Sequence, residues 1–342
     1  MKINELVIKN YKSIQEIKIV NPNPFTVFVG PNAAGKSNIF DAIEFFNTFS
    51  KNSSLDIVRL FGDIGNYNLE NKSSNSSKHF FEIKHESTQS YLDVNILFKG
   101  GGWTAQSSNF FDKKYYPDAE KNKNFKTYWD EKSYQLFFDR FSRIFTKNKD
   151  IEKFSFTDDI KLSLACGNLE QVLKRILENE NKQAEIVEWL ELLTPGFKNI
   201  EIKTEELSGS TNLLVYEKGI EKPLNKKIIS DGTYNIIALL AALYQSDEPQ
   251  FLCIEEPENG LNPKVVKELV SIFRKACKEK GHFIWLNTHS QTLVSELTSE
   301  EIILVDKVKG NTQIKQIQGM DLKGMRMDEA LLTNAIGGGI PW

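Results

Sequence analysis

The stretch that decides the fold is Phe25-Thr-Val-Phe-Val-Gly-Pro-Asn-Ala-Ala-Gly-Lys-Ser37, an apolar run followed by the pattern Gly-x-x-x-x-Gly-Lys-Ser. Apolar residues then recur at helical spacing over 37–49. A strand, a glycine-rich loop and a helix in this order form a cradle for phosphate, because the loop and the first helical turn present backbone N–H groups to the anion. The pattern therefore predicts a P-loop at 30–37, against the weaker alternative of a chance glycine-rich turn.

Each residue type in this loop has a chemical reason. Gly30 and Gly35 let the backbone turn and approach the phosphates, and Lys36 neutralises phosphate charge. The hydroxyl of Ser37 is the expected Mg²⁺ ligand. The residues predicted to bind nucleotide here are Gly30, Asn32, Gly35, Lys36, Ser37 and Asn38.

A second motif ends another apolar run, Phe251-Leu-Cys-Ile-Glu255, which Glu256 and Pro257 follow. After a P-loop, two carboxylates at the end of a strand fit a Walker B site. Glu255 would then hold Mg²⁺ through water, and Glu256 would polarise the attacking water. Aspartate is usual at the first position, and the glutamate here reaches further. Without the P-loop, the same run would be read as a surface strand end.

Two shorter motifs also precede or follow apolar elements. Ser230-Asp-Gly232-Thr comes directly before an apolar helix, so Ser230, Gly232 and the first amides could bind an anion. A plain helix N-cap at Ser230 is the alternative. Asn287-Thr-His289-Ser ends an apolar strand, and His289 could hydrogen-bond a γ-phosphate. The alternative for His289 is an ordinary residue that caps the next helix.

The composition is that of a globular protein. Of 342 residues, 40% are hydrophobic and 26% charged, and the net charge of -3 does not indicate nucleic-acid binding. No run approaches the ~20 apolar residues of a membrane span, and residues 1–14 have no signal-peptide core, so we expect a cytoplasmic protein without membrane contact. The cysteines form no metal or disulfide pattern, and reduced thiols are expected at Cys166, Cys253 and Cys277.

Hydrophobic periodicity predicts an α/β protein. The expected helices cover 37–49, 128–146, 168–193, 233–245, 263–280 and 290–297. The expected strands are three within 2–30, then 80–85, 91–98, 198–203, 211–217, 250–254, 282–287, 301–305 and 312–317. Asn71–Lys78 reads as a loop and Gly100–Gly102 as a break.

The four motifs together resemble the ABC-type AAA ATPases of the OLD and RecF-related group. The resemblance is specific over 1–50 and about 225–306, and weak over 51–220. The residues that carry it are Ile8–Ile14, Gly30–Ser37, Ser230–Thr233, Glu255–Pro263 and Thr288–Ser290. It implies a P-loop ABC-type ATPase head with an antiparallel β lobe and a compact helical insertion. The implied organisation is a core of 1–50 and 225–320, an inserted lobe of 51–224 and a tail of 321–342.

The resemblance also implies roles. Ser230–Thr233 would be the signature motif, which contacts the γ-phosphate held by another subunit, and Asn259–Asn262 would be the D-loop. Glu256 would be the catalytic carboxylate and His289 the switch histidine. The signature departs from Leu-Ser-Gly-Gly-Gln, because Asp231 and Thr233 replace its first glycine and its glutamine. The Q-loop is not placed, and Gln89 and Gln106 are weak candidates.

The implied assembly is a homodimer that closes head to tail around ATP and Mg²⁺. No Asp-x-Asp follows the head, so no Toprim nuclease is expected within the chain. We favour a regulatory ATPase that controls a separately encoded nuclease or toxin in bacterial defence against phage. The alternatives are a RecF-like DNA-binding clamp in repair and a degenerate ATPase that serves as a scaffold. The end of the tail, Gly337–Trp342, would pack on its own head or dock into a partner.

Overall fold

The computed structural model describes residues 3–51, 55–61, 76–85, 88–99, 102–111, 139–147, 159–205, 209–322, 324–333 and 335–336. Among these residues, no helix is long and apolar enough to cross a membrane. The chain forms two compact units. Unit 1 joins Met1–Phe141 to Phe283–Trp342, and unit 2 is Ser142–His282. This partition differs from the predicted core of 1–50 and 225–320 with an inserted lobe of 51–224, which stays a prediction.

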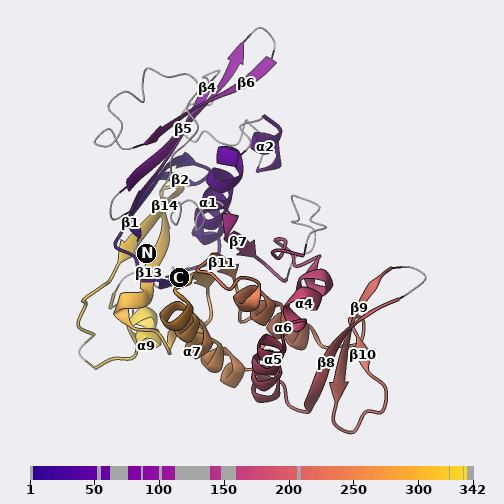
Figure 1. Ribbon diagram of the computed structural model, residues 1–342. Helices are drawn as coiled ribbons and strands as arrows, with labels where there is room; N and C mark the ends of the chain where they lie inside the picture. Colours follow the sequence, from indigo (N-terminus) through magenta and orange to yellow (C-terminus); the bar gives the residue numbers. More distant parts are fainter. Residues whose placement is uncertain are drawn as a thin grey trace. The chain divides into compact units, whose positions relative to one another are not determined.

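The first sheet of unit 1 is antiparallel, with the strand order β2-β1-β4-β5-β6 (Figure 1). β2 alternates between faces from Glu16 to Val20, so that Ile17 and Ile19 are buried while Glu16 and Lys18 are exposed. Ile8 of β1 pairs with Ile17 of β2 in the register that this alternation requires. The strands are β1 (Ile3–Tyr11), β2 (Ile14–Val20), β4 (Ser76–His85), β5 (Thr88–Lys99) and β6 (Gly102–Phe111).

The second sheet of unit 1 contains the order β14-β13-β3-β12. β3 is parallel to both of its neighbours, and Phe25 pairs with Ile284 while Val27 pairs with Ile302. All five residues of β3 are buried, as expected for a strand covered on both faces. The strands are β3 (Phe25–Val29), β12 (Phe283–Thr288), β13 (Ile302–Val308) and β14 (Asn311–Gln316).

Helix α1 follows β3 directly after the glycine-rich loop, and its phenylalanines form much of the core of unit 1. Phe28 of β3 meets Phe40 of α1 edge-to-face, with ring centroids 5.4 Å apart. The packing of the helix on the strand therefore fixes the loop between them. The described helices of unit 1 are α1 (Lys36–Lys51), α2 (Leu55–Leu60), α8 (Gln291–Val294), a 3-10 turn (Ser299–Glu301) and α9 (Met327–Leu332).

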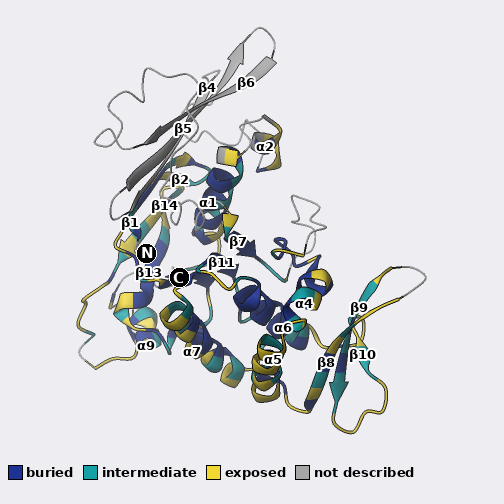
Figure 2. Ribbon diagram, viewed as in Figure 1, coloured by how far each residue is buried: buried dark blue, intermediate teal, exposed yellow. Residues whose placement is uncertain are grey.

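Unit 2 is mainly helical, with two neighbouring strands, β7 and β11, and a separate three-stranded sheet, β10-β9-β8. Its helices lie together, and the β8–β9 hairpin projects from them (Figure 1). Helix α6 is apolar on every side, and all residues from Asn235 to Tyr244 are buried (Figure 2). The elements are β7 (Phe141–Ile144), α4 (Leu169–Leu177), α5 (Glu180–Leu193), β8 (Phe197–Thr204), β9 (Thr211–Glu217), β10 (Leu224–Asn225), α6 (Asp231–Tyr244), β11 (Phe251–Glu255) and α7 (Pro263–Lys280).

Several predicted elements are wrong. Within the predicted helix 128–146, residues 141–144 form strand β7, and 128–138 lie outside the described residues. The predicted helix 168–193 is two helices, because the Asn179 side chain accepts hydrogen bonds from the backbone N–H groups of Asn181 and Lys182 and starts α5.

Smaller corrections concern element boundaries. Ser76–Lys78 belong to β4 and not to the predicted loop, and Gly102 begins β6 where a break was predicted. The predicted helix 290–297 is reduced to α8. The tail motif Gly337–Trp342 lies outside the described residues, so both expectations for it stay predictions. The remaining predicted strands and helices are present, with ends shifted by a few residues.

Candidate nucleotide site

The loop between β3 and α1 has the conformation that its glycines predict. Gly35 has φ +104°, and a Cβ there would lie 2.0 Å from Oγ1 of Thr312 and 2.9 Å from Oγ of Ser13. A Cβ on Gly30 would lie 2.0 Å from the carbonyl oxygen of Val305. Both positions therefore exclude any side chain, and Gly35 also needs the left-handed backbone that glycine adopts most easily.

Lys36 lies inside this loop. Its buried ammonium group donates to the carbonyl oxygens of Gly30, at 2.7 Å, and of Pro31, at 2.9 Å. The cation is thus held at the centre of the loop, beside the first turn of α1, whose backbone N–H groups are directed toward its N-terminal end. This donor set of an ammonium, loop amides and a helix N-terminus matches the chemistry of a nucleotide's phosphates.

Two hairpins brace the loop from outside. Ser13, in the turn between β1 and β2, lies 2.6 Å from Oγ1 of Thr312 and accepts from the Asn38 amide at 2.7 Å. Thr312, at the start of β14, donates to the carbonyl oxygen of Ala34 at 3.0 Å. Ser13 and Thr312 were not among the predicted site residues, since neither belongs to a motif and each acts from a distant part of the sequence.

The end of β12 reaches the same loop. The Asn287 amide donates to Oγ of Ser37 over 3.4 Å, at the long end of hydrogen-bond distances. His289 is exposed two residues further on, and it is Ser290 whose side chain caps α8 by accepting from the Leu293 N–H. Unit 1 therefore gathers the six predicted P-loop residues with the end of β12, and the role of His289 stays a prediction.

The second group of predicted residues lies in unit 2. β11 ends in buried Glu255, and Glu256 follows with a left-handed backbone, φ 44°, which is uncommon outside glycine. The Asn259 amide donates to Oε2 of Glu256 at 3.0 Å, and the Lys147 ammonium lies 3.6 Å from the same oxygen. Strained backbone of this kind concentrates at functional sites.

Arg143 of β7 contacts the other predicted Walker B carboxylate. Its Nε donates to Oε1 of Glu255 at 2.6 Å, and its Nη2 is paired with the same oxygen. Sequence reasoning missed this residue, because the run around it was assigned to a helix. The run Phe141-Ser-Arg-Ile-Phe145 does not alternate, and no local pattern links Arg143 to Glu255.

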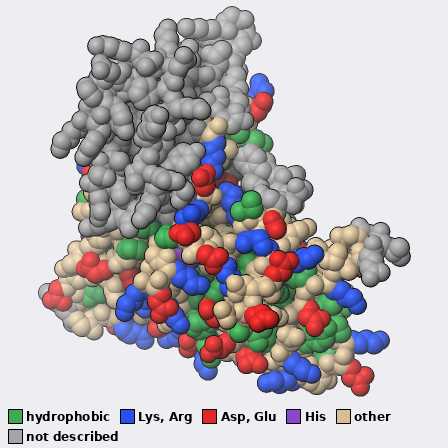
Figure 3. All heavy atoms as spheres, in the orientation of Figure 1, with side chains coloured by type: hydrophobic (Ala, Val, Ile, Leu, Met, Phe, Trp, Pro, Cys, Tyr) green, Lys and Arg blue, Asp and Glu red, His purple; other side chains and the backbone are tan. Residues whose placement is uncertain are grey.

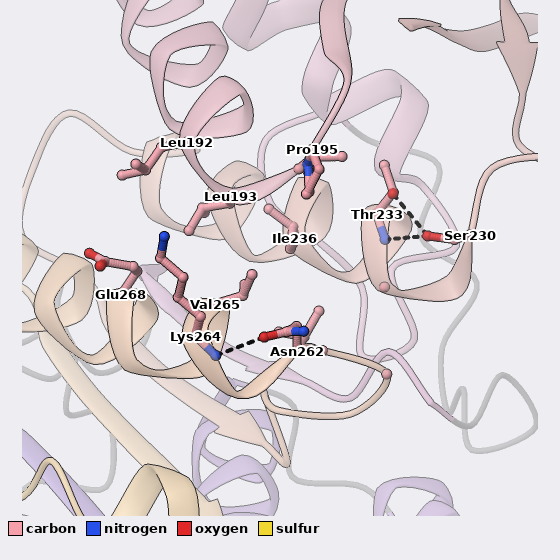
Figure 4. A pocket seen from close by; sticks show the side chains of 14 residues that line it. Leu192, Leu193, Pro195, Ser230, Thr233, Ile236, Asn262, Lys264, Val265 and Glu268 are labelled. Atoms are coloured by element: carbon pink, nitrogen blue, oxygen red, sulfur yellow. Dashed lines mark hydrogen bonds between the residues drawn. The ribbon is translucent and has the colours of Figure 1, made fainter.

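Ser230 is a true N-cap of α6, since its hydroxyl accepts from the Thr233 backbone N–H at 3.0 Å. Gly232 packs so closely on the D-loop candidate that a Cβ would lie 2.5 Å from the carbonyl oxygen of Gly260. The two predicted motifs thus form one surface, and a cavity of about 380 Å³ lies between it and the end of α5 (Figure 4). The apolar lining includes Leu192, Leu193, Pro195, Ile236 and Val265.

A buried amide joins this surface to β7 and β11. Asn235 of α6 donates to the carbonyl oxygens of Pro257 and Asn259, both at 2.9 Å, and accepts from the Thr146 hydroxyl at 2.7 Å. Signature, D-loop and the end of β7 are therefore held by one side chain. The weak Q-loop candidates Gln89 and Gln106 both lie within strands, so the Q-loop stays unassigned.

A P-loop between a buried parallel strand and a helix, in a chain with carboxylates at the end of β11, defines a P-loop ATPase of the ABC type. The chain matches the family AAA_21, described as "AAA domain, putative AbiEii toxin, Type IV TA system", over residues 25–295. It belongs to this family. The narrower OLD and RecF-related group and the absence of a Toprim domain stay predictions.

Curated relatives agree with this class. An "ATP/GTP phosphatase" of Helicobacter pylori is 20% identical over 332 residues, which cover 86% of this chain and 87% of the relative. A "Putative ABC transporter ATP-binding protein" of Pyrococcus abyssi is 27% identical over 140 residues, covering 39% and 52%. The "Energy-coupling factor transporter ATP-binding protein EcfA2" of Lactobacillus acidophilus is 29% identical over 118 residues, covering 34% and 40%. The chain thus spans about half or less of the latter two relatives.

Solved structures confirm the predicted α/β head. A crystal structure of an Smc head bound to the C-winged helix domain of ScpA aligns with a TM-score of 0.58 at 14% identity, covering 95% of this chain and 100% of that one. The Smc head of Pyrococcus furiosus, bound to the C-terminal domain of ScpA, gives 0.56 at 15% identity, covering 98% and 99%. At these identities the likeness concerns the fold alone.

Proposed function

We propose that the chain binds and hydrolyses ATP with Mg²⁺, as a homodimer that closes head to tail around the nucleotide. The observation that carries this proposal is the loop at 30–37, with Lys36 held at its centre and no room for a side chain at Gly30 or Gly35. A buried ammonium group beside a helix N-terminus is suited to neutralise the charge of bound phosphates.

The chain's own residues would divide the work. Lys36 and the loop amides would bind the phosphates, and Ser37 and Glu255 would hold Mg²⁺, which would supply neutralising charge to the phosphates. Glu256 accepts a proton from the attacking water, and its backbone strain and its contact with Asn259 orient it for that step. Ser230 and the first amides of α6 would contact the γ-phosphate of the partner's nucleotide, and His289 would hydrogen-bond a γ-phosphate as the switch histidine.

Hydrolysis is tested by comparing Lys36→Ala with Glu256→Gln. Lys36→Ala should lose nucleotide affinity, because the phosphates lose their cation. Glu256→Gln should bind ATP with near wild-type affinity and turn over at least about a hundredfold more slowly, since general-base catalysis contributes typically 10²–10⁴-fold. Nucleotide affinity from fluorescent-ATP titration and phosphate release are measured on each variant. Equal nucleotide affinity in wild type and Lys36→Ala would exclude the P-loop assignment. Wild-type turnover no faster than that of Glu256→Gln would favour a degenerate ATPase that serves as a scaffold.

We further propose that the ATPase cycle controls a separately encoded nuclease or toxin in bacterial defence against phage. The family's description, with its toxin and Type IV TA system, supports this direction. The decisive observation is the neighbouring gene, followed by co-purification of its product with the ATPase in the presence and absence of ATP. A neighbour unrelated to any effector, with no co-purifying protein, would contradict this part of the proposal.

A RecF-like DNA clamp is the alternative. Over the described part of the face in Figure 3, basic and acidic side chains alternate and form no large basic patch, which is poor support for a DNA track. Binding to duplex DNA at increasing salt separates the two functions. A clamp would bind in the presence of ATP and weaken steeply as salt rises, because phosphate contacts release counterions.

A further inference from the structure

The ion pair between Arg143 and Glu255 places a cation on the carboxylate that is expected to hold the metal. Arg143 approaches from β7, and Glu255 ends β11, its neighbour in unit 2. Two nitrogens of the guanidinium, Nε and Nη2, converge on one oxygen, Oε1. The side chains are only 7% and 4% exposed. The pair is therefore shielded from solvent and from salt, unlike a surface ion pair.

A metal ion and this guanidinium compete for the same carboxylate. The repulsion between a single and a double positive charge is twice that between two single charges at the same distance, and burial weakens its screening. Lys147 beside Glu256 adds to this positive charge, but it is 60% exposed and water screens it. Of these two cations, Arg143 is the buried one.

We infer that Arg143 keeps Glu255 from binding Mg²⁺ until nucleotide is present. This inference rests on the proposed function, since it concerns the metal of the same reaction. The negative phosphates of ATP would offset the charge of Arg143, so the metal enters with the nucleotide and not before it.

The first test uses Mg²⁺ alone, without nucleotide, and follows the unfolding temperature of the full chain. A ligand that binds only the folded state raises that temperature. Wild type should show no rise with Mg²⁺. Arg143→Met should show a saturable rise, and Arg143→Met combined with Glu255→Gln should lose it. If Arg143→Met is as insensitive as wild type, or if the double variant responds as strongly as the single one, the inference is wrong.

Arg175 provides the matched control. It is a half-buried arginine of the same unit whose guanidinium donates to the carbonyl oxygens of Asp159, Ile160 and Gln245. Arg175→Met removes an equal charge from unit 2 and should respond to Mg²⁺ as wild type does. A rise in Arg175→Met equal to that in Arg143→Met would mean that net charge alone is responsible, which also overturns the inference.

A second measurement keeps the inference separate from the proposed function. The affinity for a non-hydrolysable ATP analogue is measured with Mg²⁺ and with EDTA. The ratio of these two affinities, the Mg²⁺-dependent gain, is compared between variants. Arg143→Met should lower the Mg²⁺-dependent gain, because the variant already binds Mg²⁺ without nucleotide and the coupling between metal and nucleotide is reciprocal. Arg143→Met should cause no such fall when Glu255→Gln is also present, and an equal fall in both backgrounds contradicts the competition.

Arg143→Gln, which keeps a donor but no charge, serves the same tests if Arg143→Met does not fold. A wild type that binds no nucleotide at all overturns the proposed function, while the result with Mg²⁺ alone still decides the role of Arg143.

Discussion

At the scale of single residues, Gly35 is constrained twice, by its backbone and by its neighbours. Gly35→Ala places a methyl group against Thr312 and Ser13 in a left-handed backbone. The loop can relieve the contact only by leaving its phosphate-binding shape, and strain of about 1–3 kcal/mol corresponds to a loss of nucleotide affinity of about tenfold or more. Nucleotide titration of the purified variant measures it.

Gly319 is the control for this prediction. It also has a positive φ, +72°, but a Cβ there would meet nothing within 4 Å. Gly319→Ala should lower the unfolding temperature slightly and leave nucleotide affinity unchanged. If Gly35→Ala binds nucleotide as Gly319→Ala does, the close packing of the loop has no part in binding.

His282 predicts a pH dependence of stability. The side chain is buried at the end of unit 2, and desolvation lowers its pKa to about 4. The unfolded chain takes up a proton near the ordinary value of about 6.5 and the folded chain does not. The contribution of His282 to stability is therefore complete above pH 6.5 and falls as the pH drops toward 4, by up to about 3 kcal/mol. Denaturant unfolding of wild type and His282→Gln across this range should give a shallower dependence for the variant, and parallel curves would contradict the assignment.

At the scale of elements, the N-terminus of α6 has a structural role and a proposed functional one. Ser230→Ala removes the cap and should cost about 1 kcal/mol of unfolding free energy. If the residue also contacts the partner's γ-phosphate, ATP turnover should fall by more than the lost stability explains. Asn179→Ala removes the corresponding cap of α5 and is the matched control. Equal turnover in the two variants would leave Ser230 as a cap alone.

The same scale shows how far a sequence reveals structure. The P-loop, β3 and α1 are predictable because the glycine pattern and the apolar spacing are local. Strand β7 is not, since Phe141 and Phe145 fit the helical spacing of the residues before them, and only the place of the strand beside β11 shows the difference. The division of 168–193 into two helices rests on one side chain, Asn179, within a continuous helical pattern.

The candidate site follows the same rule. Gly30, Lys36 and Glu255 belong to motifs and could be named at once. Arg143 and Thr312 belong to no motif. Each contacts a partner that lies more than a hundred positions away in the sequence. Such pairs are defined by strand pairing and hairpin packing, which a single sequence does not reveal.

At the scale of the whole molecule, the proposed dimer makes each site depend on two chains. Glu256→Gln should form dimers with ATP that persist on size-exclusion chromatography, because closure occurs and hydrolysis does not reopen it. Lys36→Ala and Ser230→Arg should each lose turnover, and their mixture should regain part of it, since a hybrid dimer contains one intact site. Turnover by Ser230→Arg at the wild-type rate would exclude completion of the site by a partner.

The parallel pairing of β3 also bears on how the protein is made. Both neighbours of this strand, β12 and β13, lie in the last fifth of the sequence, and Val305 at the close approach to Gly30 is later still than β12. The ribosome synthesises the P-loop early and the strands that pair with β3 late. β3 therefore has no partner strand during most of synthesis. An unpaired, largely apolar strand is an aggregation hazard. The nucleotide site is thus among the last parts of the nascent chain to form, and the interval before its completion is when a chaperone would matter most.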